Sequence, residues 1–212
     1  MKTMALHHRA LELTSELVGA VRPADLGRPT PCAGWDLAAL LAHMTGQNHG
    51  FADALRGGTD VAAYAPVPGL AAWPGSVADL LDAVAHPGTD AVLLPEITVA
   101  QRFPVPVVIG FHLLDTAVHG WDVATSLGRV WRPEPPLVDA VLEQARLVPA
   151  GPARTAPGAA FAPVLAAEGE DPWMTALALL GRSPGVIARL REMACADAPG
   201  CSRRGDHAAA TA

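Results

Sequence analysis

Charged residues are scarce in this chain of 212 residues. Only 17% are Asp, Glu, Lys or Arg, while half of the residues are apolar. This composition excludes a disordered chain and supplies enough apolar side chains for the core of one domain. The net charge is −6 and the longest run of basic residues is the pair Arg203-Arg204. We therefore expect no nucleic acid among the partners of the protein.

Long apolar runs and cysteines are also few. No apolar segment reaches the ~18 residues that a membrane span requires, so no membrane partner is expected. Residues 1–18 alternate polar and apolar side chains at helical spacing, without the compact apolar centre of a signal peptide, which predicts a cytoplasmic protein. The three cysteines, Cys32, Cys195 and Cys201, form no even disulfide framework.

The spacing of leucine and valine predicts four longer helices, over residues 3–21, 36–56, 76–86 and 105–127. Asp36 and Ser76 are suitable N-caps, and Pro106 is tolerated in a first turn. Two β-prone pieces, AVLL and EITVAQRF, lie within residues 88–104 and are separated by Pro95. Helices of this kind pack as a bundle, and the pattern predicts an all-α fold.

Pro- and Gly-rich loops are predicted over residues 22–35, 59–75 and 149–171. Shorter helices are predicted over residues 136–148 and 172–181. One more helical turn is predicted over residues 184–191. We expect residues 1–190 to form the helical domain and residues 191–212 to form a disordered tail. Within the domain, residues 57–75 could wall a pocket.

The stretch FHLLDTAVHGWD, residues 111–122, places His112, Asp115 and His119 in an otherwise apolar run. In a helix, position i+3 lies about 60° behind position i and i+7 about 20° behind it, so the three side chains share one stripe. A helix that is apolar nearly all round is usually buried, and buried polar groups need partners. A metal ion is one such partner; a hydrogen-bonded network and a stripe that faces water are the alternatives.

A further ligand would come from a facing helix. His43 lies close to the apolar face of the second predicted helix, whereas His49 lies about 120° away from it. Taken alone, His43 is more often a core histidine than a ligand. Together with Asp115 and His119, it predicts a metal site of two histidines and one carboxylate.

Two segments carry a resemblance to a known family. TPCAGWDLAALLAHMTGQNHGFADALRGG and LLDTAVHGWDVATSLGR resemble the paired signatures of the DinB-like, mycothiol-dependent maleylpyruvate isomerase N-terminal-domain family. The segments AFAPV and DPWMTALALLGRSP resemble its C-terminal part. The resemblance covers residues 5–184 and implies a DinB-like four-helix bundle with short additional C-terminal helices and long Pro/Gly-rich loops.

The resemblance also implies a ligand set. In that family a divalent metal, usually zinc, is bound by one histidine of the second helix and by a carboxylate-x-x-x-histidine pair, which correspond here to His43, Asp115 and His119. The maleylpyruvate isomerase has glutamate where this chain has Asp115, so the substrate is not implied. Zinc is the metal we expect most, with Ni²⁺ or Fe²⁺ as alternatives.

Three ligands leave a tetrahedral zinc ion one open position, as catalytic sites require. A thiol or water in that position would lose its proton near neutral pH and become a nucleophile or base. His112, one turn before Asp115, is predicted to orient a ligand or carry protons as a catalytic residue. The alternative for His112 is a hydrogen bond to a loop carbonyl.

Several further side chains have simpler interpretations. Asp122 could accept the second N–H of His119. Trp35 is expected in the core or in the wall of the pocket, and Cys32 is expected to be a buried, inert thiol. His7 and His8 are expected to be exposed, and Arg102 to be solvated unless it pairs with a substrate carboxylate.

Three functional hypotheses follow. The first is a metal-dependent enzyme, a monomer or homodimer, that uses mycothiol for S-transfer or thiol-assisted isomerisation of a small electrophile. The second is a thiol-independent metal enzyme: a hydrolase, a cyclase or isomerase of secondary metabolism, or an oxygenase, because two histidines and one carboxylate also form the facial triad of non-haem iron. The third is a bundle that binds a metal or a small ligand without catalysis. The resemblance favours the first.

Overall fold

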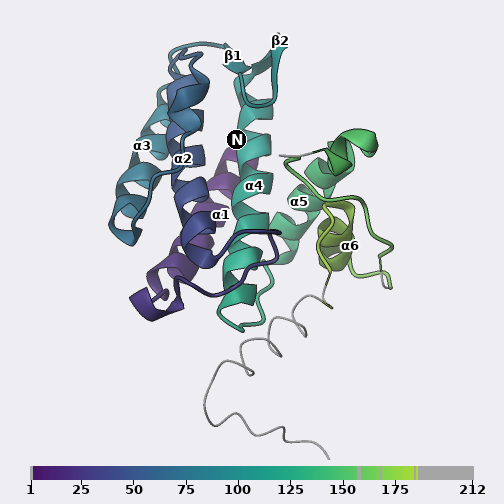
Figure 1. Cartoon of the computed structure of the whole chain (residues 1–212). Helices are drawn as coiled ribbons and strands as arrows, with labels where there is room; N and C mark the ends of the chain where they lie inside the picture. Colours follow the sequence, from purple (N-terminus) through teal and green to yellow (C-terminus); the bar gives the residue numbers. More distant parts are fainter. Residues whose placement is uncertain (1, 157–158, 168, 184, 186–212) are drawn as a thin grey trace, which may run out of the picture.

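The computed structural model describes residues 2–156, 159–167, 169–183 and 185, and within them the chain is mostly helical. Four helices lie side by side (Figure 1). They are α1 (Lys2–Gly19), α2 (Leu37–Leu55), α3 (Trp73–Ala85) and α4 (Val105–Ser126). Two further helices, α5 (Pro135–Leu147) and α6 (Pro172–Leu179), pack against each other, and α5 contacts α4. Single 3₁₀ turns cover Pro23–Asp25, Val61–Tyr64, Leu70–Ala72 and Pro152–Thr155.

Helix α4 is the centre of the packing, as its apolar character predicted. Nearly every residue from Val108 to Ser126 is buried. Helix α1 packs along α4, α2 packs along α3, and α2 and α5 also contact α4. Because α4 is covered on most sides, any polar side chain that it carries must find a partner inside the protein.

The first residues of α2 and α3 explain where these helices start, and the start predicted for α3 is corrected. Asp36 is the predicted N-cap of α2, and its carboxylate accepts the Ala39 N–H at 2.8 Å. Helix α3 starts at Trp73 instead of at Ser76, because Pro74 suits the first turn of a helix. The Ser76 hydroxyl lies inside that helix, where it donates to the Trp73 carbonyl at 2.8 Å.

The fold class requires a second correction, because the described residues include a small sheet. Strands β1 (Ala91–Leu94) and β2 (Thr98–Pro104) form an antiparallel hairpin, in which Ala91 pairs with Pro104 and Leu94 pairs with Thr98. The two β-prone pieces of the sequence are therefore strands. The hairpin stands at the end of the bundle where α4 begins (Figure 1).

The loop over residues 57–72 lies against α2 instead of standing away from it. The ring of Tyr64 packs edge-on against Phe51. A Cβ at Gly50 would lie 2.2 Å from the Tyr64 ring, and a Cβ at Gly46 would lie 2.5 Å from the Ala65 carbonyl oxygen. Two glycines one turn apart on α2 thus permit this close approach.

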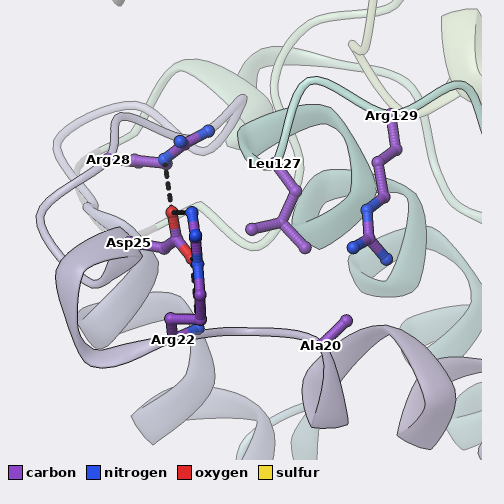
Figure 2. Close-up of a pocket in the computed structure, with 6 residues that line it drawn as sticks. All are labelled: Ala20, Arg22, Asp25, Arg28, Leu127 and Arg129. Atoms are coloured by element: carbon purple, nitrogen blue, oxygen red, sulfur yellow. Dashed lines mark hydrogen bonds and ion pairs between the residues drawn. The ribbon is translucent and has the colours of Figure 1, made fainter.

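The loop between α1 and α2 is held by an ion-pair cluster around Asp25 (Figure 2). The buried Asp25 carboxylate accepts from Arg22 Nε at 3.0 Å and pairs with Arg28 Nε at 2.9 Å. Together with Leu127 and Arg129 at the end of α4, these residues line a surface hollow. The cluster holds the loop against the ends of α1 and α4.

Among the described residues, none of the helices combines the length and the hydrophobicity of a transmembrane span. The tail predicted over residues 191–212, with Cys195 and Cys201, lies outside the described residues, as do most of the predicted turn over residues 184–191 and the predicted end of the domain at residue 190.

Hydrogen bonds from Arg22 hold the pKa of Asp25 at about 2, although its burial acts in the opposite direction. The ionised carboxylate therefore stabilises the fold above the ordinary aspartate pKa near ~4, and this contribution is lost as the pH falls toward 2. We predict that Asp25→Asn lowers the melting temperature by a few degrees at pH 7 and by less at pH 3. Equal effects at both pH values, in thermal unfolding followed by circular dichroism, would contradict this.

Candidate metal centre

The structure brings together the three side chains that the sequence predicts as ligands. One ligand atom from each of His43, Asp115 and His119 lies within 4.8 Å of the other two. His119 Nε2 lies 3.4 Å from Asp115 Oδ1, and the rings of His43 and His119 meet nearly edge to face with centroids 5.2 Å apart. His43 is carried by α2, and the other two residues are carried by α4. Two helices thus present two nitrogens and one oxygen to one point.

Local helix geometry explains half of this arrangement. Asp115 and His119 are four residues apart on one helix, so their side chains are neighbours on the same face. His43 reaches them only because α2 packs against α4. His119 is 7% exposed, while the Asp115 side chain keeps 23% of its surface exposed and His43 is half-buried. The cluster is therefore reached from solvent on the side of Asp115 and His43.

A second layer of side chains fixes the orientation of His119. Its Nδ1 lies 2.9 Å from Asp122 Oδ2. The pKa of Asp122 is lowered to about 2, since Arg182 and His119 outweigh the effect of burial. An ionised carboxylate can only accept a hydrogen bond, so Nδ1 carries the proton and Nε2 faces Asp115. This confirms the prediction that Asp122 accepts the second N–H of His119.

Arg182 completes this layer from the C-terminal part of the chain. Its Nη2 donates to Asp122 Oδ2 at 3.0 Å, and its Nη1 donates to the Leu180 carbonyl at 3.0 Å. The guanidinium lies over the ring of Phe161, 5.7 Å from its centroid, and Arg182 is 7% exposed. This arginine belongs to the GRSP segment, whose pattern predicts no role for it. A buried carboxylate requires a positive partner, and that requirement was the signal available for Arg182.

The charges at the centre suit a cation. Burial opposes it, but Asp115 and Asp122 raise the pKa of His119 well above its usual value. The pKa of Asp115 is lowered in turn, because the neighbouring histidines outweigh its burial. The carboxylates that favour a positive charge on the His119 ring would also favour a divalent cation between the same groups. The pKa of His43 is lowered, chiefly by burial, which keeps its ring neutral and able to bind metal. The residues fit a divalent cation.

Cys32 and Trp35 reach the centre from the loop before α2. The Cys32 thiol donates to Asp122 Oδ2 at 3.2 Å and lies 3.9 Å from His119 Nδ1. Cys32, His119 and Asp122 are also close enough to share an ion, but the Arg182 guanidinium already supplies positive charge there. The ring of Trp35 packs on His43 with centroids 4.7 Å apart and is 37% exposed, so it does not lie in the core; its place in a pocket wall stays a prediction.

His112 belongs to a different polar cluster on α4. Its Nε2 donates to Asn48 Oδ1 at 3.1 Å, and its Nδ1 lies 3.0 Å from both His7 Nε2 and Thr116 Oγ1. Burial lowers the pKa of His112 to about 4, so the ring is neutral. The catalytic role predicted for His112 stays a prediction; its two ring nitrogens are occupied by side chains, not by the loop carbonyl that was the alternative.

Three other expectations can be compared with the structure. His7 is fully buried, which corrects its expected exposure, whereas His8 is exposed as expected. His49 pairs with Asp79, at 3.3 Å, and takes no part in the metal cluster. Arg102 donates to the Ala91 carbonyl within the hairpin. The burial of His7 could not be predicted from its polar sequence neighbours, because its contact with His112 joins residues 105 positions apart.

Comparison with known proteins identifies the family. Residues 7–124, which include α1 to α4 except for the extreme ends, match the mycothiol maleylpyruvate isomerase N-terminal domain. The chain belongs to this family. Two uncharacterised proteins of Mycobacterium tuberculosis, from strains CDC 1551 and H37Rv, are each 31% identical to it over 173 residues, which cover 76% of this chain and 87% of theirs. No solved structure matches the sequence.

Membership of the mycothiol maleylpyruvate isomerase family agrees with the geometry of the centre. The matched region contains His43, Asp115, His119 and Asp122. Metal binding is general in the family, and the cluster offers a group of side chains that could hold an ion. Arg182 lies outside the matched region, although it contacts Asp122 inside it.

We predict that the purified protein carries about one equivalent of divalent metal, and that His43→Ala and His119→Ala each abolish this occupancy, because two remaining ligands bind weakly. Elemental analysis of the three proteins measures this directly. His49→Ala is the matched control on α2 and should retain the metal. Full occupancy in both ligand variants would overturn the assignment of the ligands.

We also predict that Asp122→Asn weakens metal binding by about 10- to 100-fold, because His119 loses the acceptor that selects its tautomer. Arg182→Gln should act in the same direction by leaving Asp122 buried without its positive partner. Competition with a chromogenic chelator measures the affinity. Asp82→Asn, an exposed position on α3, serves as control; affinities equal to wild type in both variants would refute a supporting role.

Proposed function

We propose that this protein is a divalent-metal-dependent enzyme that uses a low-molecular-weight thiol, mycothiol, for S-transfer to a small electrophile or for its thiol-assisted isomerisation. The convergence of His43, Asp115 and His119 in a chain of this family is the observation that supports the proposal. We infer Zn²⁺ as the metal, a DinB-like arrangement for α1 to α4, and small molecules as the only partners needed for the reaction.

The donor set supports a catalytic centre over a purely structural one. Three protein ligands leave a fourth position open, whereas structural zinc sites are closed by four. A divalent cation bound there would supply a Lewis acid that lowers the pKa of a thiol or water in the open position. Among the described residues, no fourth side chain joins the group of His43, Asp115 and His119.

The surrounding side chains supply orientation and shielding. Asp122 and Arg182 hold the ring of His119 in one tautomer and one direction. The Trp35 ring covers one face of His43. Apolar neighbours of α4 limit access of water from behind the centre, which strengthens charge interactions there. A reactant therefore reaches the ligands from the exposed side of Asp115.

Both proposed reactions begin with transfer of the thiol proton to a base. In S-transfer, sulfur bonds to the electrophilic carbon as the leaving group departs with its electron pair and takes up a proton. In isomerisation, sulfur adds to a conjugated double bond whose electron pair moves onto the neighbouring carbonyl. Rotation about the new single bond follows, and elimination breaks the carbon–sulfur bond and restores the double bond.

We predict that the metal-loaded protein with mycothiol converts maleylpyruvate to its trans isomer, followed by NMR of the substrate. Omission of the thiol and His119→Ala should each reduce the rate to the background value. A different electrophile, such as monobromobimane, tests S-transfer in parallel. Absence of both reactions, together with no thiol-induced change in the spectrum of the cobalt-loaded protein, would overturn the proposed use of a thiol.

The same two histidines and one carboxylate also fit non-haem iron. If the purified protein contains iron, anaerobic reconstitution with Fe²⁺ followed by exposure to oxygen would separate an oxygenase from the thiol enzyme. Oxygen consumption that depends on His43 and His119 but not on thiol would favour that alternative.

A further inference from the structure

The turn of the hairpin carries a carboxylate that is anchored beside the metal centre. Glu96 lies between β1 and β2, and its Oε2 accepts from Gln47 Nε2 at 2.7 Å. Gln47 is 4% exposed and follows His43 by four residues on α2. Residues four apart share a face of a helix, so Gln47 lies on the same face as the ligand His43, one turn further along.

The position of Glu96 is close to the centre but outside the ligand cluster. Glu96 lies in an exposed turn, but the desolvation of its carboxyl raises the pKa; the charge of Asp115 acts in the same direction, and the hydrogen bond from Gln47 acts against it. However, none of the metal-binding groups formed by the described residues includes Glu96. The charge of Glu96 thus acts on Asp115, the partly exposed ligand, although Glu96 does not belong to the set of three donors.

Gln47 holds the Glu96 carboxylate without neutralising its charge. Gln47 donates a neutral hydrogen bond to one oxygen, and in the described part of the chain Glu96 forms no ion pair with lysine, arginine or histidine. Asp122, by contrast, is kept ionised by Arg182. A carboxylate held by an amide keeps a second oxygen to accept a proton, and a raised pKa brings it closer to the pH at which proton transfer is efficient.

We propose that Glu96 is the catalytic proton-transfer residue of this centre, positioned by Gln47 on the side from which a reactant enters. This inference rests on the proposed function. Glu96 takes the proton from the thiol as the carbon–sulfur bond forms, and it returns that proton to sulfur on elimination or to the leaving group in S-transfer. The carboxylate is regenerated in each cycle, so that no net proton is gained or lost.

Glu96 and the metal ligands are carried by different elements of the structure. Glu96 comes from a hairpin turn, whereas His43, Asp115 and His119 come from helices. Within the described part of the chain, the side chain of Glu96 is tied to α2 by its hydrogen bond with Gln47 and to none of the three ligands. Substitution of Glu96 should therefore leave the metal in place, which separates its role from that of a ligand.

Glu96→Gln tests the proposal, with Glu143→Gln on the exposed surface of α5 as the matched control. We expect both variants to bind metal as wild type does. In the cobalt-loaded protein without thiol, the pH midpoint of the change in visible absorption should fall by about half a unit or more in Glu96→Gln, because a nearby negative charge is removed. Glu143→Gln should leave the midpoint unchanged.

Under the thiol reaction, Glu96→Gln should lower kcat/KM by about 10²- to 10⁴-fold, and Gln47→Leu should lower it less, because Glu96 is kept but loses its anchor. Loss of the metal in Glu96→Gln would show a ligand instead and overturn the proposal, as would an unchanged midpoint or an unchanged rate. If the midpoint shifts in Glu96→Gln but the wild-type protein has no thiol activity, the place of Glu96 beside the metal is supported and only the thiol reaction is refuted.

Discussion

A histidine presents Nε2 to a cation only when its other ring nitrogen carries the proton, and here Asp122 imposes that choice on His119. Asp122 is fully buried, so its charge needs a partner inside the protein, and Arg182 supplies it from 60 residues further along the chain. Removal of either partner would leave a buried charge uncompensated. The C-terminal segment thus contributes to a centre whose predicted ligands lie on α2 and α4.

Helix α4 carries two polar clusters with different electrostatics. His112 is surrounded by neutral partners, Asn48, Thr116 and His7, and burial keeps it uncharged. His119, two turns later, lies between two carboxylates, which raise its pKa. The first cluster joins α1, α2 and α4 by hydrogen bonds, whereas the second concentrates opposite charges at a place that solvent reaches. A divalent cation would bind at the second.

The helices and the loops have separate parts in this centre. Helices α2 and α4 position the predicted ligands, because packed helices hold side chains within narrow limits. Loops supply Cys32, Trp35 and Glu96. Loops vary more readily than the elements they connect, so one metal scaffold can serve different reactions through changes at such positions. The residues at these loop positions can be compared with those of the two uncharacterised mycobacterial relatives.

Short-range patterns in the sequence determined much of the fold and part of the centre. Helical periodicity located α1, α2, α4, α5 and α6 to within a few residues, Asp36 marked the start of α2, and the one-turn spacing placed Asp115 next to His119. The β-prone pieces on either side of Pro95 proved to be strands, although the helical signals elsewhere favoured an all-α class. The position of His43 on the apolar face of its helix, and then the family resemblance, predicted it as the third member of the group that the structure brings together.

Only the tertiary structure decided which distant residues complete the metal centre. The burial of His7, the contact of Arg182 with Asp122 and the anchoring of Glu96 by Gln47 join residues 49 to 105 positions apart. No periodicity of a single helix records such contacts, because they depend on how α1, α2, the hairpin and the C-terminal segment pack around α4. The sequence determined which side chains α2 and α4 offer; packing decided which other charges and donors stand beside them.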